Sequence, residues 1–378
     1  MPDLSKLILA IQNDTAARLV VRFFYFAQRR LKSIPVVPRR EIDGSTEELL
    51  GFYERVAYWN MTMDPVRTEA YRQAAVCFEG LRTIDLGTGA HAPQAKLALD
   101  GGATHVDAIE AKAETAAAAR DFLAQPENDW SQNVTLWEGL SFDVDLPTRA
   151  EGLVHEIVGT VGSDEGFPIC VADAQERLLV PEATIVPQCV QTWMIPIGEI
   201  RPGLLSRVLS GMLVGASRPE TTPGVQLIYN PPRSTWLAEE PQLMESFTTG
   251  PGEPPMKAQL EQTRSLTFRC VRAGRFTGFL LGCRVITRPG APVVDALTSI
   301  TSWGNACVRM SEEPRDVREG ETLAVEVSVD ARKFIPRYQI DVRFEDGEAW
   351  STTWRGPAIS PVKDDAVEDS SGDASPTT

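Results

Sequence analysis

Two glutamates nine positions apart, Glu156 and Glu165, are the residues of this chain whose types and spacing could do chemistry together. They lie in the segment His155–Gly166, downstream of a glycine-rich turn at Gly87 and Gly89. Two carboxylates on one loop can bind a guanidinium, because this group is planar, permanently charged and forms bidentate hydrogen bonds. The spacing therefore predicts a site for the guanidino group of arginine.

The glycine turn follows a short apolar run and predicts the backbone of a nucleotide site. Gly87 and Gly89 let the chain turn sharply and approach a ligand closely, and Glu110 ends the next predicted strand, where its carboxylate can accept both ribose hydroxyls. A third glycine is missing, because Ala-His-Ala follows Gly89, and this disfavours a pyrophosphate and therefore a dehydrogenase. A methionine-type cofactor with an adenosine but no pyrophosphate fits this turn.

Short apolar strands alternate with helices from about residue 51 to residue 196, which predicts an α/β domain with a doubly wound parallel sheet. From 197 to 361, β-rich runs broken by Gly and Pro predict an antiparallel β-barrel or sandwich, interrupted by a helix over 201–215. Residues 1–50 form a predicted helical extension whose apolar face must pack on the catalytic domain or on another subunit. The acidic segment 362–378 is predicted to be disordered.

Composition limits the classes of partner. The 378 residues include 37 Lys and Arg against 52 Asp and Glu, a formal net charge of −15, which disfavours nucleic acid and attracts cationic ligands. The three histidines and six cysteines show no metal-ligand spacing, so we expect no metal. The start lacks a signal-peptide pattern and no apolar run reaches about 18 residues, so we expect a cytoplasmic protein without a membrane span.

Several blocks of sequence follow one another in a recognisable order. Residues Met61–Arg72 contain the pattern M-x-x-D-x-x-R-T-x-x-Y, and further blocks lie at Asp85–Gly89, Ala108–Glu110 and Asn133–Pro147, before the glutamate pair and Thr301-Ser302-Trp303. In order and spacing these blocks resemble the protein arginine methyltransferases, including their double-E loop, over roughly residues 55 to 350. Serine replaces the histidine of the family's threonine-histidine-tryptophan loop, and a Ser-Trp pair resembles the symmetric-dimethylating branch.

The resemblance implies S-adenosyl-L-methionine as the cofactor. Arg67 would pair with the cofactor carboxylate, Asp85 and Gly87 would line its methionine end, and Glu110 would hold the ribose. Ser141 or a neighbour would contact the adenine amine, where the family often has an acidic residue. Each assignment has a structural alternative: an ion pair on a helix surface for Arg67, a strand-end cap for Asp85 and a solvated carboxylate for Glu110.

The resemblance also implies the roles of residues on the substrate side. Glu156 and Glu165 would be the catalytic pair, aligning the guanidinium and leaving its reacting nitrogen more nucleophilic. Met61, Ser302 and Trp303 would line the substrate pocket, although core packing is an alternative role for Trp303.

The motifs leave the size of the substrate open. The composition and the lack of an evident peptide-docking module favour free L-arginine or a small arginine-containing metabolite, and protein or peptide arginine is the alternative. A catalytically silent member that binds the cofactor as an assembly partner is a further alternative, which the retention of both glutamates disfavours. Members of this family are commonly dimeric, so we expect a homodimer to which residues 1–35 contribute.

Overall fold

The computed structural model describes Arg22, Met61 and residues 63–200, 223–229 and 231–356. Apart from Arg22, the predicted helical extension over residues 1–50 lies outside the described residues. The helix predicted over 201–215 and the tail over 362–378 also lie outside them. These predictions therefore stay predictions.

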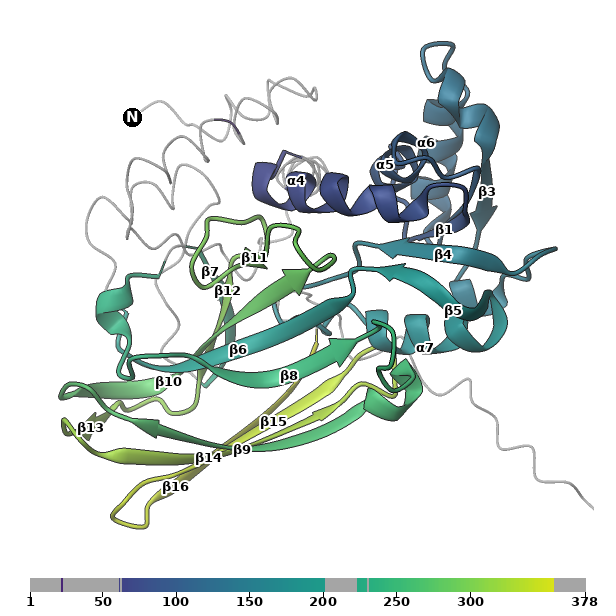
Figure 1. Ribbon diagram of the computed structural model, residues 1–378. Helices are drawn as coiled ribbons and strands as arrows, with labels where there is room; N and C mark the ends of the chain where they lie inside the picture. The colour runs from purple at the N-terminus through teal and green to yellow at the C-terminus, as the bar shows by residue number, and fades with distance from the viewer. Residues whose placement is uncertain (1–21, 23–60, 62, 201–222, 230, 357–378) are drawn as a thin grey trace, which may run out of the picture.

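The first domain is a five-stranded parallel sheet with helices on both faces (Figure 1). The strands lie in the order β3-β2-β1-β4-β5, so the chain begins at the central strand β1, continues through β2 to the edge strand β3, and then crosses to β4 and the other edge at β5. This doubly wound arrangement confirms the predicted α/β fold. Its elements are α4 (Pro65–Ala74), η1 (Ala75–Phe78), β1 (Arg82–Leu86), α5 (Pro93–Asp100), β2 (His105–Glu110), α6 (Ala113–Leu123), η2 (Asp129–Asn133), β3 (Val134–Glu138), η3 (Ser141–Asp143), β4 (Ala150–His155), α7 (Phe167–Arg177) and β5 (Leu179–Val186).

The local sequence explains why these elements form where they do. Almost every residue of β1 and β4 is buried, which suits the near-continuous apolar runs of parallel strands covered on both faces. Asp64 is the N-cap of α4 and Pro65 follows at its first position, a common helix start. Ala95 and Ala98 of α5 are buried, and their small side chains let this helix pack closely on the sheet.

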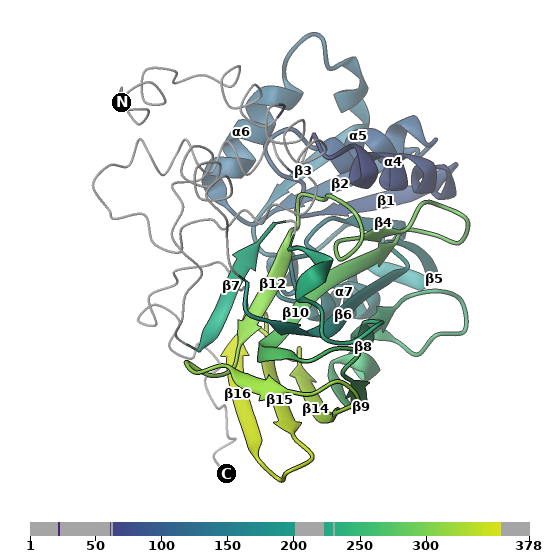
Figure 2. The same cartoon turned by 90° about the vertical axis from the view of Figure 1, so that its left-hand side faces the viewer.

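The second domain consists of two antiparallel sheets stacked as layers (Figures 1 and 2). Seven strands form one sheet, with the path β7-β12-β10-β6-β8 and β11 and β13 paired to β10, and four strands form the other, in the order β16-β15-β14-β9. The predicted antiparallel barrel or sandwich is confirmed. Its elements are β6 (Cys189–Gly198), β7 (Gly224–Ile228), η4 (Arg233–Thr235), β8 (Gln242–Thr248), η5 (Met256–Gln259), β9 (Glu261–Arg269), β10 (Gly274–Ile286), β11 (Val294–Asp295), β12 (Asn305–Arg309), β13 (Arg315–Val317), β14 (Thr322–Asp330), β15 (Arg337–Arg343) and β16 (Ala349–Arg355).

The two domains share one hydrophobic core. Phe167 of α7 packs edge-on against Phe247 of β8, with 5.5 Å between the ring centroids, and the buried residues around them belong to a single cluster that runs from the parallel sheet into the barrel. The antiparallel pairing begins with β6 at Cys189, before the boundary expected at residue 197. The barrel is therefore packed tightly enough on the parallel sheet to contribute side chains to a shared site.

Two further observations concern the described residues. None of the helices in this part of the chain is long and apolar enough to cross a membrane. All six cysteines are free thiols, three of them buried and three partly buried.

Candidate active site

The glycine turn lies directly after β1 and beneath the glutamate-containing loop. Gly87 and Gly89 have positive φ angles of 77° and 69°, which glycine adopts without steric cost. A Cβ on Gly87 would approach the Ile157 side chain to 2.8 Å. The backbone N–H groups of Gly87 and Thr88 donate to the carbonyl of Ile109, which closes the turn against β2. Only glycine at position 87 therefore lets the turn lie this close to the residue after Glu156.

Asp85, at the end of β1, is completely buried. Its Oδ2 accepts hydrogen bonds from the Thr88 hydroxyl at 2.5 Å and from the Ala95 backbone N–H at 2.9 Å. Its Oδ1 is buried without a hydrogen-bond partner among the described residues. Burial raises the pKa of Asp85 to about 7, and the nearby Glu156 and Glu110 carboxylates contribute to this rise. Asp85 thus braces the turn with one oxygen and leaves the other available to a donor.

Glu110, at the end of β2, is 8% exposed. Its two oxygens accept hydrogen bonds from the backbone N–H groups of Gly89 and Lys112, each at 3.0 Å. The carboxylate predicted for the ribose therefore already connects the glycine turn to the start of α6.

Helix α4 joins the parallel-sheet domain to the barrel. Asp64 Oδ1 accepts from the backbone N–H groups of Val66 and Arg67, and Asp64 Oδ2 accepts from the backbone N–H of Ser302 at 2.7 Å. One carboxylate thus caps the helix and fixes the Thr301–Trp303 segment beside it.

Arg67 is the centre of the site. Its guanidinium forms an ion pair with Glu156, donates to the Ser302 hydroxyl at 3.1 Å and lies 4.5 Å above the ring centroid of Trp303. Burial opposes the charge on Arg67, but the Glu156 carboxylate outweighs burial and raises the Arg67 pKa above its usual value. The structure thus brings four predicted site residues into contact and pairs Arg67 with a glutamate of the predicted pair.

The two glutamates differ in environment. Glu156 is partly buried, and its second oxygen accepts from the Gln94 side-chain amide at 2.9 Å. Glu165 is exposed and, within the described residues, its carboxylate forms no hydrogen bond or ion pair. Surrounding protein that limits its solvation, together with the Glu156 charge, raises the Glu165 pKa, and Arg67 and Lys112 oppose this rise. Glu165 therefore has both oxygens available to a ligand.

The loop between the glutamates is bonded to the barrel at several points. Trp303 Nε1 donates to the Val158 carbonyl at 2.5 Å, and the Thr160 hydroxyl donates to the Trp303 carbonyl at 2.8 Å. Trp303 is 5% exposed, so it supports the loop from the core and has one face against Arg67. The structure thus gives Trp303 a place in the core, and its role as a wall of the substrate pocket stays a prediction.

The two remaining predicted residues make other contacts. Ser141 is buried at the start of η3, and its carbonyl accepts from the Arg177 guanidinium at 2.7 Å. Met61 is 41% exposed, and its carbonyl accepts from the Asp64 backbone N–H at 3.3 Å. Among the described residues, no group of three or more His, Cys, Asp or Glu side chains could hold a metal ion.

Three residues of the site were not assigned a role from the sequence. Asp64 could have been found, because an aspartate directly before a proline at a helix start is a common N-cap. Gln94 and Thr160 have no such signal, because their partners, Glu156 and Trp303, are distant in sequence. Their roles follow only from the tertiary structure.

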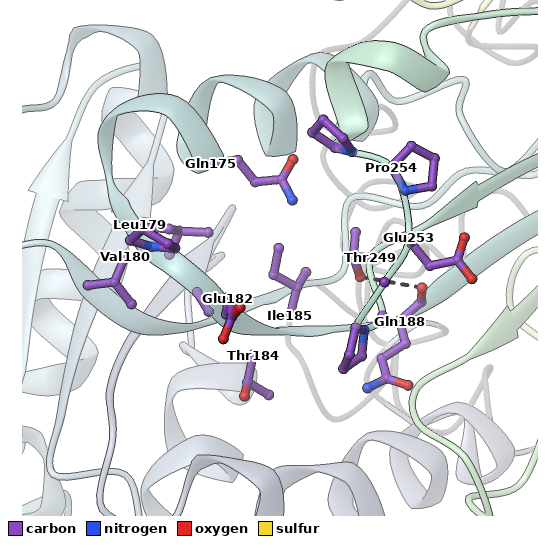
Figure 3. A pocket seen from close by; sticks show the side chains of 16 residues that line it. Gln175, Leu179, Val180, Glu182, Thr184, Ile185, Gln188, Thr249, Glu253 and Pro254 are labelled. Atoms are coloured by element: carbon purple, nitrogen blue, oxygen red, sulfur yellow. Dashed lines mark hydrogen bonds between the residues drawn. The ribbon is translucent and has the colours of Figure 1, made fainter.

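A separate cavity of about 530 Å³ lies at the outer edge of β5 (Figure 3). Its lining comes from residues 179–185, the loop 249–255 and Gln175 of α7, and includes Glu182 and Glu253. None of the predicted site residues lines this cavity. It is therefore distinct from the glutamate pair.

Curated relatives match a little more than a third of the chain. A probable histone-arginine methyltransferase CARM1 of Oryza sativa subsp. indica is 31% identical over 144 residues, covering 37% of this chain and 27% of the relative. Protein arginine N-methyltransferase PRMT10 of Oryza sativa subsp. japonica is 33% identical over 141 residues, covering 36% of each. The chain thus aligns with about a quarter to a third of the length of these relatives. No family model matches it.

Solved structures match over most of the chain. The Trypanosoma brucei PRMT1 enzyme-prozyme heterotetrameric complex with AdoHcy has a TM-score of 0.63 and 17% identity, covering 79% of this chain and 97% of that one. Arabidopsis thaliana protein arginine methyltransferase 10, in an open conformation, has a TM-score of 0.62 and 19% identity with the same coverage. These matches establish the fold.

A doubly wound parallel sheet, a glycine turn after its first strand and a barrel packed against the following loop define the methyltransferase fold with an appended barrel. In this fold, and in sequence over a little more than a third of its length, the chain is similar to protein arginine methyltransferases. The resemblance to the symmetric-dimethylating branch stays a prediction.

Proposed function

We propose that this protein transfers a methyl group from S-adenosyl-L-methionine to a guanidino nitrogen of arginine. One observation carries the proposal: the site already holds a guanidinium, that of Arg67, between the Glu156 carboxylate and the Trp303 ring. Beside it, the exposed Glu165 carboxylate has no partner among the described residues and can bind a second guanidinium. The chemistry of these groups therefore suits an arginine side chain.

The residues around the glycine turn fit the cofactor. The unpaired Asp85 Oδ1 is a buried acceptor that could receive an ammonium group, and the close approach allowed at Gly87 leaves the backbone accessible to a ligand. The ribose hydroxyls could replace the backbone N–H groups of Gly89 and Lys112 as hydrogen-bond donors to the Glu110 carboxylate. When bound, S-adenosyl-L-methionine would supply an electrophilic methyl group on its sulfonium.

The glutamates would act by alignment and electrostatics. A guanidinium delocalises the lone pair that must attack. The Glu165 carboxylate, and the Glu156 carboxylate once the substrate replaces its Gln94 partner, would bind two of the guanidinium nitrogens and draw positive charge toward them. The third nitrogen is then held in one orientation and becomes more nucleophilic. The raised pKa of Glu165 also suits it to accept the proton that the methylated nitrogen releases.

We propose an arginine of a protein or peptide as the substrate. Free L-arginine, our expectation from the sequence, finds no support in the relatives, whose names describe histone-arginine and protein arginine methyltransferases. The alternative that the sequence left open is therefore favoured.

The test is to incubate the protein and labelled S-adenosyl-L-methionine with four substrates in separate samples. The substrates are an arginine-rich peptide, a protein mixture, free L-arginine and N-acetylated, C-amidated arginine. Mass spectrometry should find methylated arginine in the peptide or protein samples, with slower reaction of the two small substrates. Faster methylation of free arginine than of the peptide would reverse the substrate assignment. Cofactor binding without turnover on any of the four would reject the enzyme and support a silent assembly partner.

A further inference from the structure

A buried carboxylate of the barrel holds the middle of the loop that carries the two glutamates. The backbone N–H of Ser163 donates to Glu245 Oε1 at 3.1 Å, and the Ser163 hydroxyl donates to Glu245 Oε2 at 2.7 Å. Next to them, the Gly162 backbone N–H donates to the Thr192 hydroxyl at 2.8 Å. Two consecutive loop residues are therefore bonded to β6 and β8 just before Glu165.

Glu245 is fully buried and reaches this position through an irregularity of β8. Thr192 pairs with Glu245 and Trp193 with Leu243, so Met244 is an extra residue in β8. A bulge of this kind breaks the alternation of a strand and redirects a side chain. Met244 and Glu245 are consecutive, yet both are buried. The bulge thus turns a carboxylate inward toward the loop.

The hydrogen bonds around Glu245 run in one direction. Thr192 donates to Glu245 Oε1 at 2.6 Å, and because the Ser163 hydroxyl donates to Oε2, the Tyr338 hydroxyl donates to Ser163 at 2.8 Å. Burial raises the Glu245 pKa, and the three donors, with a smaller contribution from the Arg264 charge, oppose this rise. Among the described residues, no cation forms an ion pair with Glu245. Hydroxyl and amide donors, two of them on Ser163, therefore compensate the buried carboxylate.

Packing alone does not require this arrangement. A buried carboxylate carries a large desolvation cost, and an apolar residue of similar size would fill the same space without it. The carboxylate instead fixes the orientation of the loop, because it accepts hydrogen bonds from both the backbone N–H and the hydroxyl of Ser163. Gly162 adds to the close fit, since a Cβ there would lie 2.8 Å from the Val190 side chain.

We propose that Glu245 is a positioning residue for the glutamate pair, holding Ser163 so that Glu165 stays at its working distance from Glu156. The inference rests on the proposed function, because it concerns the same site. Among the described residues, Glu245 forms no hydrogen bond with either glutamate, so it would act through Ser163.

Three variants remove these contacts stepwise. Glu245→Gln replaces one acceptor with a donor, Ser163→Ala removes the hydroxyl but keeps the backbone donor, and Tyr338→Phe removes only the outer donor. Glu326→Gln is the matched control, because Glu326 is an exposed glutamate on β14. Each protein is measured for amide hydrogen exchange, cofactor affinity by calorimetry, and kcat and KM for an arginine-rich peptide.

In Glu245→Gln we expect exchange at the Gly162 and Ser163 amides to speed up by about tenfold or more, since a hydrogen bond to a charged acceptor is lost. The kcat should fall by a similar factor, with cofactor affinity and the exchange of β14 unchanged. Ser163→Ala should show a smaller effect of the same pattern, Tyr338→Phe a still smaller one, and Glu326→Gln none.

The outcomes separate the two proposals. Wild-type exchange and kcat in both Glu245→Gln and Ser163→Ala would overturn the positioning role. If Glu245→Gln does not fold, Ser163→Ala decides, and unchanged values in it would likewise overturn the role. If Glu245→Gln speeds amide exchange at the loop but the wild-type protein methylates no arginine, the positioning of the loop by Glu245 is supported and the proposed function is rejected.

Discussion

Asp64 and Ser302 are 238 positions apart in sequence, and the Asp64 carboxylate accepts a hydrogen bond from the Ser302 backbone N–H at 2.7 Å. The same carboxylate caps α4 through the N–H groups of Val66 and Arg67. One side chain therefore sets the start of the helix that carries Arg67 and the position of the barrel segment that faces it. Both neighbours of the Arg67 guanidinium from the barrel, Ser302 and Trp303, depend on this contact.

We expect Asp64→Ala to destabilise the protein by about 2 kcal/mol, since loss of an N-cap alone costs about 1 kcal/mol and the hydrogen bond from the Ser302 N–H to Asp64 is also lost. Urea unfolding measures this change. Glu69→Ala is the control, because Glu69 lies on the same helix but is 43% exposed and pairs with Arg72 on the surface. Equal stability loss in the two variants would contradict the bridging role of Asp64.

Much of this site could be predicted from residue types and their order, but not the contacts. Arg67 was predicted as a site residue from its motif, yet its ion pair with Glu156 joins two segments 89 positions apart. Such a contact depends on how α4 packs over the end of β4, which no local pattern encodes. The strands could be predicted from their apolar runs, because alternating apolar residues indicate burial on one face and continuous apolar residues indicate burial on both.

Glu245 shows the opposite case. In the strand Gln242–Thr248, strict alternation would place Met244 and Glu245 on opposite faces, and the glutamate would be predicted to face solvent. The bulge at Met244 buries both, and it arises from the pairing of β8 with β6. Sequence patterns fail here because a bulge is defined by two strands together.

A comparison of substitutions at Gly87 and Gly80 tests the contact between Gly87 and Ile157. Both have a positive φ, at 77° and 78°, but a Cβ on Gly80 would meet nothing within 4 Å, whereas one on Gly87 would approach the Ile157 side chain to 2.8 Å. Gly80→Ala should cost about 1 kcal/mol for the left-handed backbone. Gly87→Ala should cost more and should also weaken cofactor binding, because the turn or Ile157 must move.

Urea unfolding and calorimetry with S-adenosyl-L-methionine measure both effects. Equal losses of stability in Gly87→Ala and Gly80→Ala would show that the Ile157 contact is unimportant.

Asp85 should make stability depend on pH in a definite direction. Its pKa is about 7 in the folded protein and near 3.8 when it is solvated, so the folded state binds the extra proton between these values. The stability from Asp85 is therefore complete below about pH 4 and is lost as the pH rises to about 7. Asp85→Asn lacks this dependence, so its melting temperature relative to wild type should rise across that window. A difference that stays constant from pH 4 to 7 would reject the shifted pKa.

The sequence-based prediction of a homodimer remains open, because residues 1–35 lie outside the described residues except Arg22. We expect sedimentation analysis to give a dimer for the full chain and a smaller species after removal of residues 1–35. An unchanged oligomeric state after truncation would remove the role of this segment.

The two glutamates should differ in what their loss does to the protein. Glu165 is exposed and unpaired among the described residues, so Glu165→Gln should leave the free energy of unfolding within about 0.5 kcal/mol of wild type. Glu156 compensates the buried Arg67, whose side chain is 3% exposed, so Glu156→Gln should destabilise the protein by about 3 kcal/mol. Both variants should lower kcat by orders of magnitude, because each removes a charge that addresses the substrate guanidinium.

Urea unfolding and initial rates with labelled cofactor separate these effects. The informative variant is Glu165→Gln. We expect it to fold with normal stability and to keep the Arg67–Glu156 ion pair, so that only the contact with the substrate changes. Cofactor affinity should be nearly unchanged in it, since Glu165 addresses the guanidinium rather than the adenosine. A wild-type rate in Glu165→Gln would mean that a single carboxylate, Glu156, orients the substrate, and the paired-carboxylate mechanism would have to be abandoned.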